Sequence, residues 1–174
     1  MPNKDGTLKA REFIFFCEDQ ILTGWPADTP EPTRKVMWTT LQFHWGEPRV
    51  HFELQPMMGR RLIETGLHFE GPEEMNDAWA VALGSRADDF IPELGFEWEL
   101  EDWTKSWKRL HRPYHFEQLT TELGREIAAE LRRVMLILYP FIAERVDTEG
   151  MSPAPIERKE HSHRNWRRRS GARR

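Results

Sequence analysis

The chain has 174 residues, of which 39% are hydrophobic, a length that suits one domain because chains begin to divide into several only near ~250 residues. Cys17 is the only cysteine, which excludes an intramolecular disulfide, a CxxC redox pair and a zinc site built from thiolates. The formal charge is −4, but residues 150–174 hold eight basic side chains against two glutamates, a net of +6, which leaves −10 for residues 1–149. We therefore expect a single folded domain over residues 1–149 and a basic, disordered tail over residues 150–174.

Residues 8–23 (LKAREFIFFCEDQILT) place apolar side chains close to a period of 3.6 and predict a helix with a wide apolar face. The segment FIFFC offers more apolar surface than one buried stripe requires, which indicates either self-association or burial on two sides. Residues 24–35 contain three prolines and a glycine, and these predict a connecting loop.

Three runs rich in aromatic and β-branched residues follow, at residues 36–45, 49–55 and 61–70. Only the short segments GEP and PMMG lie between them, and such connections have no room for a crossover helix. The three runs therefore predict an antiparallel meander.

Residues 71–95 open with a proline and two glutamates and predict a second helix. Residues 96–103 (FEWELEDW) alternate apolar and acidic side chains and predict a half-buried strand, with residues 106–114 as its basic partner strand. Residues 120–144 show helical spacing again, with a threonine cap at the start and a break near Pro140.

The predicted order is helix, three strands, helix, two strands, helix. This order predicts the α+β class, with an antiparallel five-stranded sheet that carries its helices on one face. No stretch approaches the ~18 consecutive apolar residues of a membrane span, so we expect no membrane partner and a cytoplasmic location.

The triplet His-Phe-Glu occurs at residues 51–53, 68–70 and 115–117. In a strand the first and third residues of each triplet share one face, while the phenylalanine points to the other. A tight turn after the second predicted strand would bring several of these polar side chains together. The candidate ligand-binding residues are His44, Arg49, His51, Glu53, Glu64 and His68.

Two readings of this polar face stay open. Imidazole and carboxylate groups from adjacent strands are able to hold a divalent metal, with a free glutamate as base. A sheet covered by helices on one side also collects such residues on its solvated side, and this second reading predicts no metal and no cofactor.

Period-two alternation further predicts which side chains enter the core. We expect Phe52, Phe69, Trp98 and Leu100 in the core, and His51, Glu53, His68 and Glu99 on the opposite, solvated face.

The sequence contains no P-loop, GxGxxG, GxSxG or HExxH motif, so phosphate cradling, a nucleophile elbow and the helical zinc motif are unsupported. The basic tail has the composition of a nucleic-acid-binding arm, in which arginines neutralise phosphates and a tryptophan stacks on bases. Its candidate residues are Arg164, Trp166, Arg167, Arg168 and Arg169.

Two family resemblances follow from these patterns. Through Leu94-Gly95, Trp98-Glu99 and Pro140, the C-terminal half resembles an uncharacterised bacterial domain family found attached to nuclease-like modules. The order of helices and strands resembles the type III secretion chaperone-like fold, whose members bind other proteins and dimerise. Neither resemblance implies catalytic residues here, and no lysine for a restriction-nuclease site lies between Lys35 and Lys105.

We therefore expect a non-enzymatic binding or adaptor module that associates with a protein partner or with itself, in the latter case as a homodimer. One alternative is a metal-dependent enzyme that uses the His/Glu face. The other is a nucleic-acid-associated accessory domain that acts through its basic tail.

Overall fold

The computed structural model describes residues 6–148. Its elements are α1 (Ala10–Leu22), β1 (Thr33–Met37), β2 (Thr40–His44), β3 (Val50–Met57), a 3-10 turn (Met58–Arg60), β4 (Leu62–Phe69), α2 (Glu73–Gly84), α3 (Ala87–Leu94), β5 (Glu99–Asp102), β6 (Lys108–His115) and α4 (Thr121–Thr148). Within this range no helix is long and apolar enough to cross a membrane.

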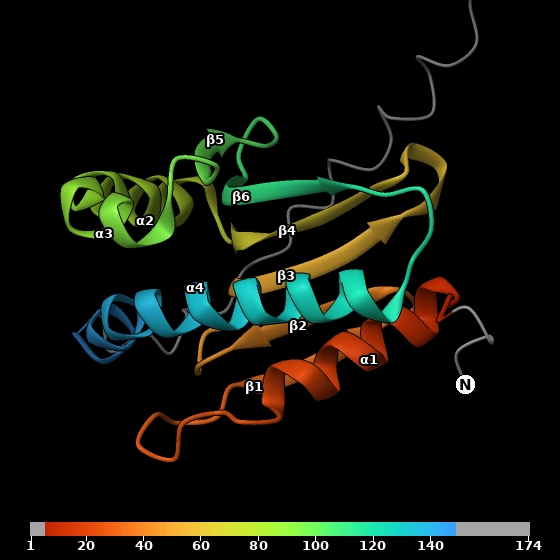
Figure 1. Cartoon of the computed structure of the whole chain (residues 1–174). Helices are drawn as coiled ribbons and strands as arrows, with labels where there is room; N and C mark the ends of the chain where they lie inside the picture. The colour runs from red at the N-terminus through yellow and green to blue at the C-terminus, as the bar shows by residue number, and fades with distance from the viewer. Residues whose placement is uncertain (1–5, 149–174) are drawn as a thin grey trace, which may run out of the picture.

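The described residues form one six-stranded antiparallel sheet in the order β1-β2-β3-β4-β6-β5. Figure 1 shows β1 and β5 at opposite edges of this sheet. The α+β class, the antiparallel sheet, the meander of β2, β3 and β4 and the pairing of the acidic strand with the basic one are confirmed. The prediction of five strands is wrong, as is the predicted order of elements.

The additional strand comes from a hairpin within the run predicted as one strand. Met37 pairs with Thr40, so Trp38 and Thr39 form a two-residue turn between β1 and β2. The turn contains none of the Gly, Asn or Asp residues that normally mark such a hairpin. β1 begins at Thr33 inside the predicted loop, directly after Pro32, a position that suits an edge strand.

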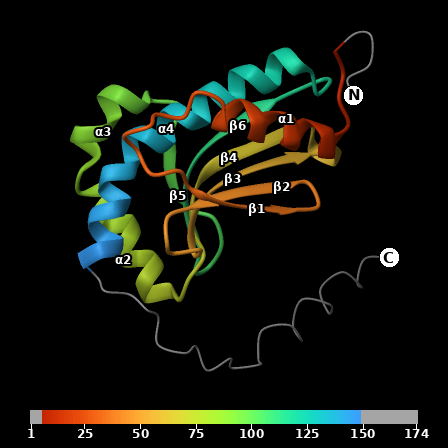
Figure 2. The same cartoon turned by 90° about the horizontal axis from the view of Figure 1, so that it is seen from below.

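The helices cover one face of the sheet (Figure 2). α1 and α4 pack side by side, and Gly124 permits their close approach, because a Cβ there would lie 2.8 Å from the ring of Phe16. Cys17 in α1 donates to the Gly124 carbonyl at 3.7 Å. α2 joins the same layer through Trp79, whose ring stacks on that of Phe69 in β4 at 6.0 Å.

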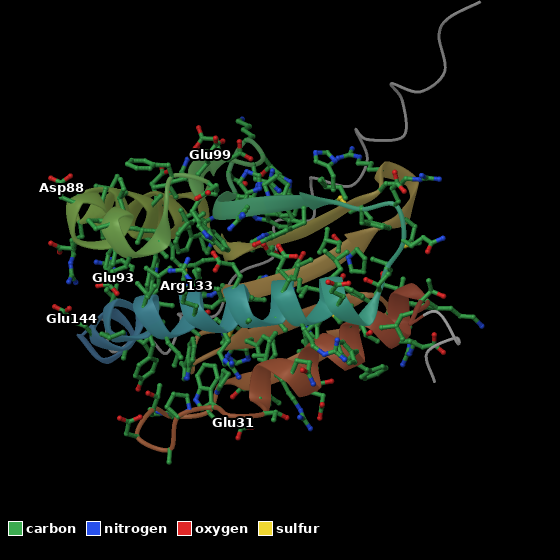
Figure 3. The ribbon with its side chains drawn as sticks, viewed as in Figure 1. Glu31, Asp88, Glu93, Glu99, Arg133 and Glu144 are labelled. Carbon is green, nitrogen blue, oxygen red and sulfur yellow. The ribbon has the colours of Figure 1, made fainter. Side chains whose placement is uncertain are left out.

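The predicted second helix is two helices. α2 ends near Ser85, whose hydroxyl donates to the Ala82 carbonyl at 2.8 Å, and α3 starts anew with Asp88 and Asp89 in its first turn. Arg133 on α4 points towards the end of α3, where it donates to the carbonyls of Glu93 and Leu94 (Figure 3).

The predicted break of the last helix near Pro140 is wrong, because α4 continues to Thr148. A proline inside a helix costs ~3 kcal/mol. Phe141 and Ile142, the next two residues, are both buried, and burying each contributes roughly 1.5–3 kcal/mol. The packing therefore outweighs the proline. The predicted threonine cap is confirmed, since the Leu123 amide donates to Thr120 Oγ1 at 3.2 Å.

Phe52, Phe69 and Trp98 are buried, as predicted, but Leu100 is not, with 39% of its surface exposed. Leu100 lies on the edge strand β5, which has a strand neighbour on only one side. On α1, Phe15 is exposed, whereas Phe13, Ile14 and Cys17 are buried. Self-association through this helix stays a prediction.

Candidate metal centre

The face of the sheet opposite α1 and α4 carries polar side chains from neighbouring strands. Along β3, His51 and Glu53 alternate with Phe52 and Leu54, which belong to the core. The pairing places His51 directly opposite His68 of β4, and Gln42 of β2 opposite Glu53. Alternation and register together therefore gather imidazole, carboxylate and amide groups over the middle of the sheet.

These side chains are buried, and the prediction of a solvated face is wrong for His51, Glu53 and His68. His68 has no exposed surface at all. The ring of Trp103, from the connection between β5 and β6, packs edge-on against that of His68 with centroids 4.9 Å apart. The guanidinium of Arg109 in turn lies 5.1 Å from the Trp103 ring. These contacts shield the polar face from water.

Four of these residues, His51, Glu53, His68 and Glu70, form a group that we call the quartet. One nitrogen of each histidine and one oxygen of each glutamate lie within 4.8 Å of one another. His51 Nε2 is 3.5 Å from Glu53 Oε2 and 4.0 Å from Glu70 Oε1. Ligand atoms around a tetrahedral zinc ion, with bonds of ~2.1 Å, are roughly 3.4 Å apart. Small side-chain movements would therefore close the quartet around an ion.

The tautomer of His51 suits a metal ligand. Its Nδ1 lies 3.0 Å from the carbonyl oxygen of Pro48, and a carbonyl only accepts hydrogen bonds. Nδ1 must therefore carry a proton, so in the neutral imidazole the lone pair lies on Nε2, the nitrogen that faces Glu53. A backbone carbonyl that orients a histidine in this way is typical of metal sites.

His68 has a nitrogen without a partner. Its Nδ1 lies 3.2 Å from Glu70 Oε1, so Nδ1 donates to that carboxylate and Nε2 holds a lone pair. Among the described residues, no group forms a hydrogen bond with this buried Nε2. An unsatisfied buried polar atom costs about 1–3 kcal/mol, and the contact of His68 with Glu70 is made through the other nitrogen, Nδ1.

Gln42 connects two members of the quartet. Its amide nitrogen donates to Glu53 Oε2 at 2.9 Å and lies 3.0 Å from His51 Nε2. With an ion between these atoms, the amide would have to turn away or present its oxygen. Gln42 therefore holds the two ligand atoms in position.

The electrostatics of the quartet favour a cation. Burial of Glu53 raises its pKa, but the hydrogen bond that protonated His51 donates, the positive charges that His68 and His51 carry when protonated and the hydrogen bond from Gln42 together hold the pKa of Glu53 below its usual value. Glu53 is thus ionised at neutral pH. With both imidazoles neutral, the two carboxylates of the quartet give a charge of −2, which a divalent ion would neutralise.

A second polar group lies beside the quartet on β4, β6 and β5. Glu64 Oε1 lies 2.7 Å from His111 Nδ1 and 2.9 Å from Arg109, and Glu101 Oε1 lies 3.1 Å from His111 Nε2. Both nitrogens of His111 therefore face carboxylates. Gly66 pairs with His111, and its lack of a side chain lets β4 and β6 approach closely at this point.

The structure brings together three of the six predicted candidates, His51, Glu53 and His68. The other three lie outside the quartet. Glu64 binds His111 and Arg109, and Arg49 pairs with Glu47 at 2.7 Å. His44, at the end of β2, has its pKa lowered by burial and by the nearby His51.

The prediction did not include Glu70 or the second polar group. The repeat of His-x-Glu at 68–70 is a signal for Glu70, since it repeats the spacing at 51–53. The second group had no such signal, because nothing in the sequence indicates that β6 lies next to β4. The tail candidates Arg164, Trp166, Arg167, Arg168 and Arg169 lie outside the described residues.

Comparison of the chain with protein-family models, with curated proteins and with solved structures found no match. The two family resemblances and the cytoplasmic location therefore stay predictions. Function has to be argued from the site itself.

Proposed function

We propose that this protein binds one divalent transition-metal ion through His51, Glu53, His68 and Glu70. The observation that carries the proposal is the convergence of four ligand atoms within 4.8 Å, on a face where three of the four residues are buried. Mixed imidazole and carboxylate ligands suit zinc, manganese or iron, whereas magnesium and calcium prefer oxygen ligands alone.

The ion has a structural role in this proposal. Four protein ligands are typical of closed structural sites, whereas catalytic zinc sites keep one position for water. The ligands come from β3, from β4 and from the residue after β4, so the ion would join the two central strands. This role departs from the reading without a metal, and the binding or adaptor module expected from the sequence stays a prediction.

A metal-dependent enzyme is the second candidate, and Glu70 is the reason. Its side chain is 19% exposed, more than those of the other three ligands, and it follows the last residue of β4. If a water molecule replaced Glu70 on the ion, the site would have the open position of a hydrolytic centre.

Metal content and metal titration of the full-length protein test the first proposal. We expect one zinc, manganese or iron ion per chain, removed by a chelator and restored by titration. His68→Ala should weaken binding at least ~10-fold. The matched control is His115→Ala, because His115 belongs to the third His-Phe-Glu triplet but is exposed and outside the quartet.

Thermal unfolding gives an independent readout. An ion at 100 times its dissociation constant stabilises the folded state by about 2.7 kcal/mol, which raises Tm by roughly 5–11 °C for a chain of this size. The rise should be absent in His68→Ala and present in His115→Ala. A folded wild-type protein that binds none of the three metals would overturn the proposal. The second candidate requires hydrolysis of an ester or phosphoester by the metal-loaded protein that disappears in His68→Ala.

A further inference from the structure

The turn between β1 and β2 carries an exposed tryptophan in a backbone conformation that suits glycine. Trp38 has a φ of 53° and 85% of its surface is exposed. Two-residue hairpin turns with a positive φ at the first position normally hold glycine there, and a bulky aromatic residue in this region is an outlier. Such strain persists mainly at binding and functional sites.

The rest of this hairpin is basic and partly apolar. Met37 and Lys35 on β1 are exposed, and Arg34 forms one ion pair, with Glu18 of α1 at 3.1 Å. The Trp38 hairpin (residues 33–44) therefore presents an indole at its tip and cationic side chains along its edge strand.

A hollow of about 590 Å³ lies at the other edge of the sheet, between α2 and the strands β5 and β6. Its lining combines apolar residues with a carboxylate rim and comprises Asp77, Ala80, Val81, Leu100, Glu101 and Asp102. Lys108 also lines it and bonds Asp77 at 2.9 Å and Asp102 at 2.7 Å, so two carboxylates share one ammonium group, while Glu101 pairs with Arg109 at 2.6 Å. Val81 and Leu100 are both exposed large apolar residues.

The geometry points to self-association in which the Trp38 hairpin of one copy enters the hollow of a second copy. The strands of the hairpin, β1 and β2, and the strands that border the hollow, β6 and β5, lie at opposite edges of the sheet (Figure 1), so hairpin and hollow cannot meet within one chain. The basic hairpin complements the carboxylates of Asp77 and Asp102, which share one ammonium group, and the exposed Val81 and Leu100 offer apolar surface to the Trp38 indole. The carboxylates would repel nucleic-acid phosphates, which favours a second copy as the occupant.

This contact is heterologous, because two different surfaces meet. Each copy keeps a free hairpin and a free hollow after the first contact, so association continues into a ring or a linear chain. The inference does not depend on the metal site, which lies in the middle of the sheet.

The mass of the full-length protein in solution, measured by analytical ultracentrifugation from about 1 μM to about 1 mM, tests this inference. We expect the mass to rise with concentration and the association to weaken with added salt, because opposite charges meet at the rim. Trp38→Gly should weaken association at least ~30-fold, as for an interface hot spot. Because glycine suits the turn, this variant should unfold at the same temperature as the wild type or higher.

A second variant removes the other surface. Val81→Arg fills the hollow and adds a cation, and the fold tolerates it because Val81 is exposed on a helix that carries Asp77 one turn earlier. Each variant alone should be monomeric. An equimolar mixture should give a dimer and nothing larger, because only the hairpin of Val81→Arg and the hollow of Trp38→Gly remain intact.

Phe96→Ser is the matched control, since Phe96 is an aromatic residue with 88% exposure that belongs to neither surface. It should associate like the wild type. Three results would each overturn the inference: a wild-type protein that stays monomeric at about 1 mM, association that Trp38→Gly leaves unchanged, or a mixture of the two variants that stays monomeric.

Discussion

Replacing Gly66 with alanine places a methyl group where two central strands have no room for one. Gly66 lies in β4 opposite His111 of β6, on the polar face of the sheet. A Cβ at this position would lie 2.6 Å from the Leu110 carbonyl oxygen, and 3.0 and 3.1 Å from the Cβ and Cα of His111. Carbon atoms pack at ~3.5 Å or more, so β6 must move away by several tenths of an ångström.

The cost follows from the atoms that have to move. Adding a methyl group to a well-packed site costs about 1–3 kcal/mol. Here the closest atom is a backbone oxygen that cannot rotate away, which places the cost at the upper end. Alanine also lowers the conformational entropy of the unfolded chain, which stabilises the folded state by about 0.4–1 kcal/mol. The free energy of unfolding should therefore fall by about 2 kcal/mol, and Tm by roughly 4–8 °C.

Urea denaturation and calorimetry of Gly66→Ala measure this change. The control is Gly59→Ala, because within residues 6–148 no atom beyond its own chain neighbours lies within 4 Å of a Cβ at Gly59, and its φ is not positive. The control should be as stable as the wild type. If Gly66→Ala unfolds within about 0.5 kcal/mol of Gly59→Ala, the close approach of β4 and β6 is wrong.

Two further substitutions test other polar contacts. The pKa of Glu130 lies below its usual value because Arg133 and the Trp98 indole donate hydrogen bonds to its carboxylate. Partial burial acts in the opposite direction but is outweighed. Glu130→Gln should therefore destabilise the protein by about 1 kcal/mol at pH 7. This difference from the wild type should shrink as the pH falls below ~4.3, because the wild-type carboxylate then becomes protonated. An equal difference at pH 3 and pH 7 in urea titrations would contradict the role of the charge. Asn76→Ala should lower the free energy of unfolding by about 2–4 kcal/mol, because fully buried Asn76 forms three hydrogen bonds with the backbone of Gly71 and Ser106. A variant as stable as the wild type in the same titrations would refute a stabilising role for these hydrogen bonds.

Local patterns were sufficient to predict much of the sheet. Alternation located β3, β4 and β5, and the short connections between β2, β3 and β4 left no choice but antiparallel pairing. The β1–β2 hairpin escaped prediction because its turn, Trp38-Thr39, holds no residue that favours a turn. The continuation of α4 beyond Pro140 was not predicted, because the packing of Phe141 that offsets the proline involves residues far away in the sequence.

For the candidate metal centre, too, local patterns predicted one part and long-range packing determines the other. Alternation along two strands predicts that His51, Glu53 and His68 share a face, since only a short turn connects the strands. Their burial depends on Trp103, which lies 35 residues after His68 in the sequence and reaches it only because β6 pairs with β4. No periodicity within β3 or β4 contains that information.

The length of α4 has a consequence for hydrogen exchange. Phe141 contacts the rings of Trp79 and Phe90 on α2 and α3, while Arg132 donates to the Thr23 carbonyl after α1 at 2.6 Å. One helix therefore joins the first half of the domain to the second, and neither half can open without losing contacts to α4. The amides in the middle of α4 should exchange with solvent only through global unfolding, and those of α1 and α2 should approach the same rate as denaturant is added. The two halves of the domain thus form one cooperative unit.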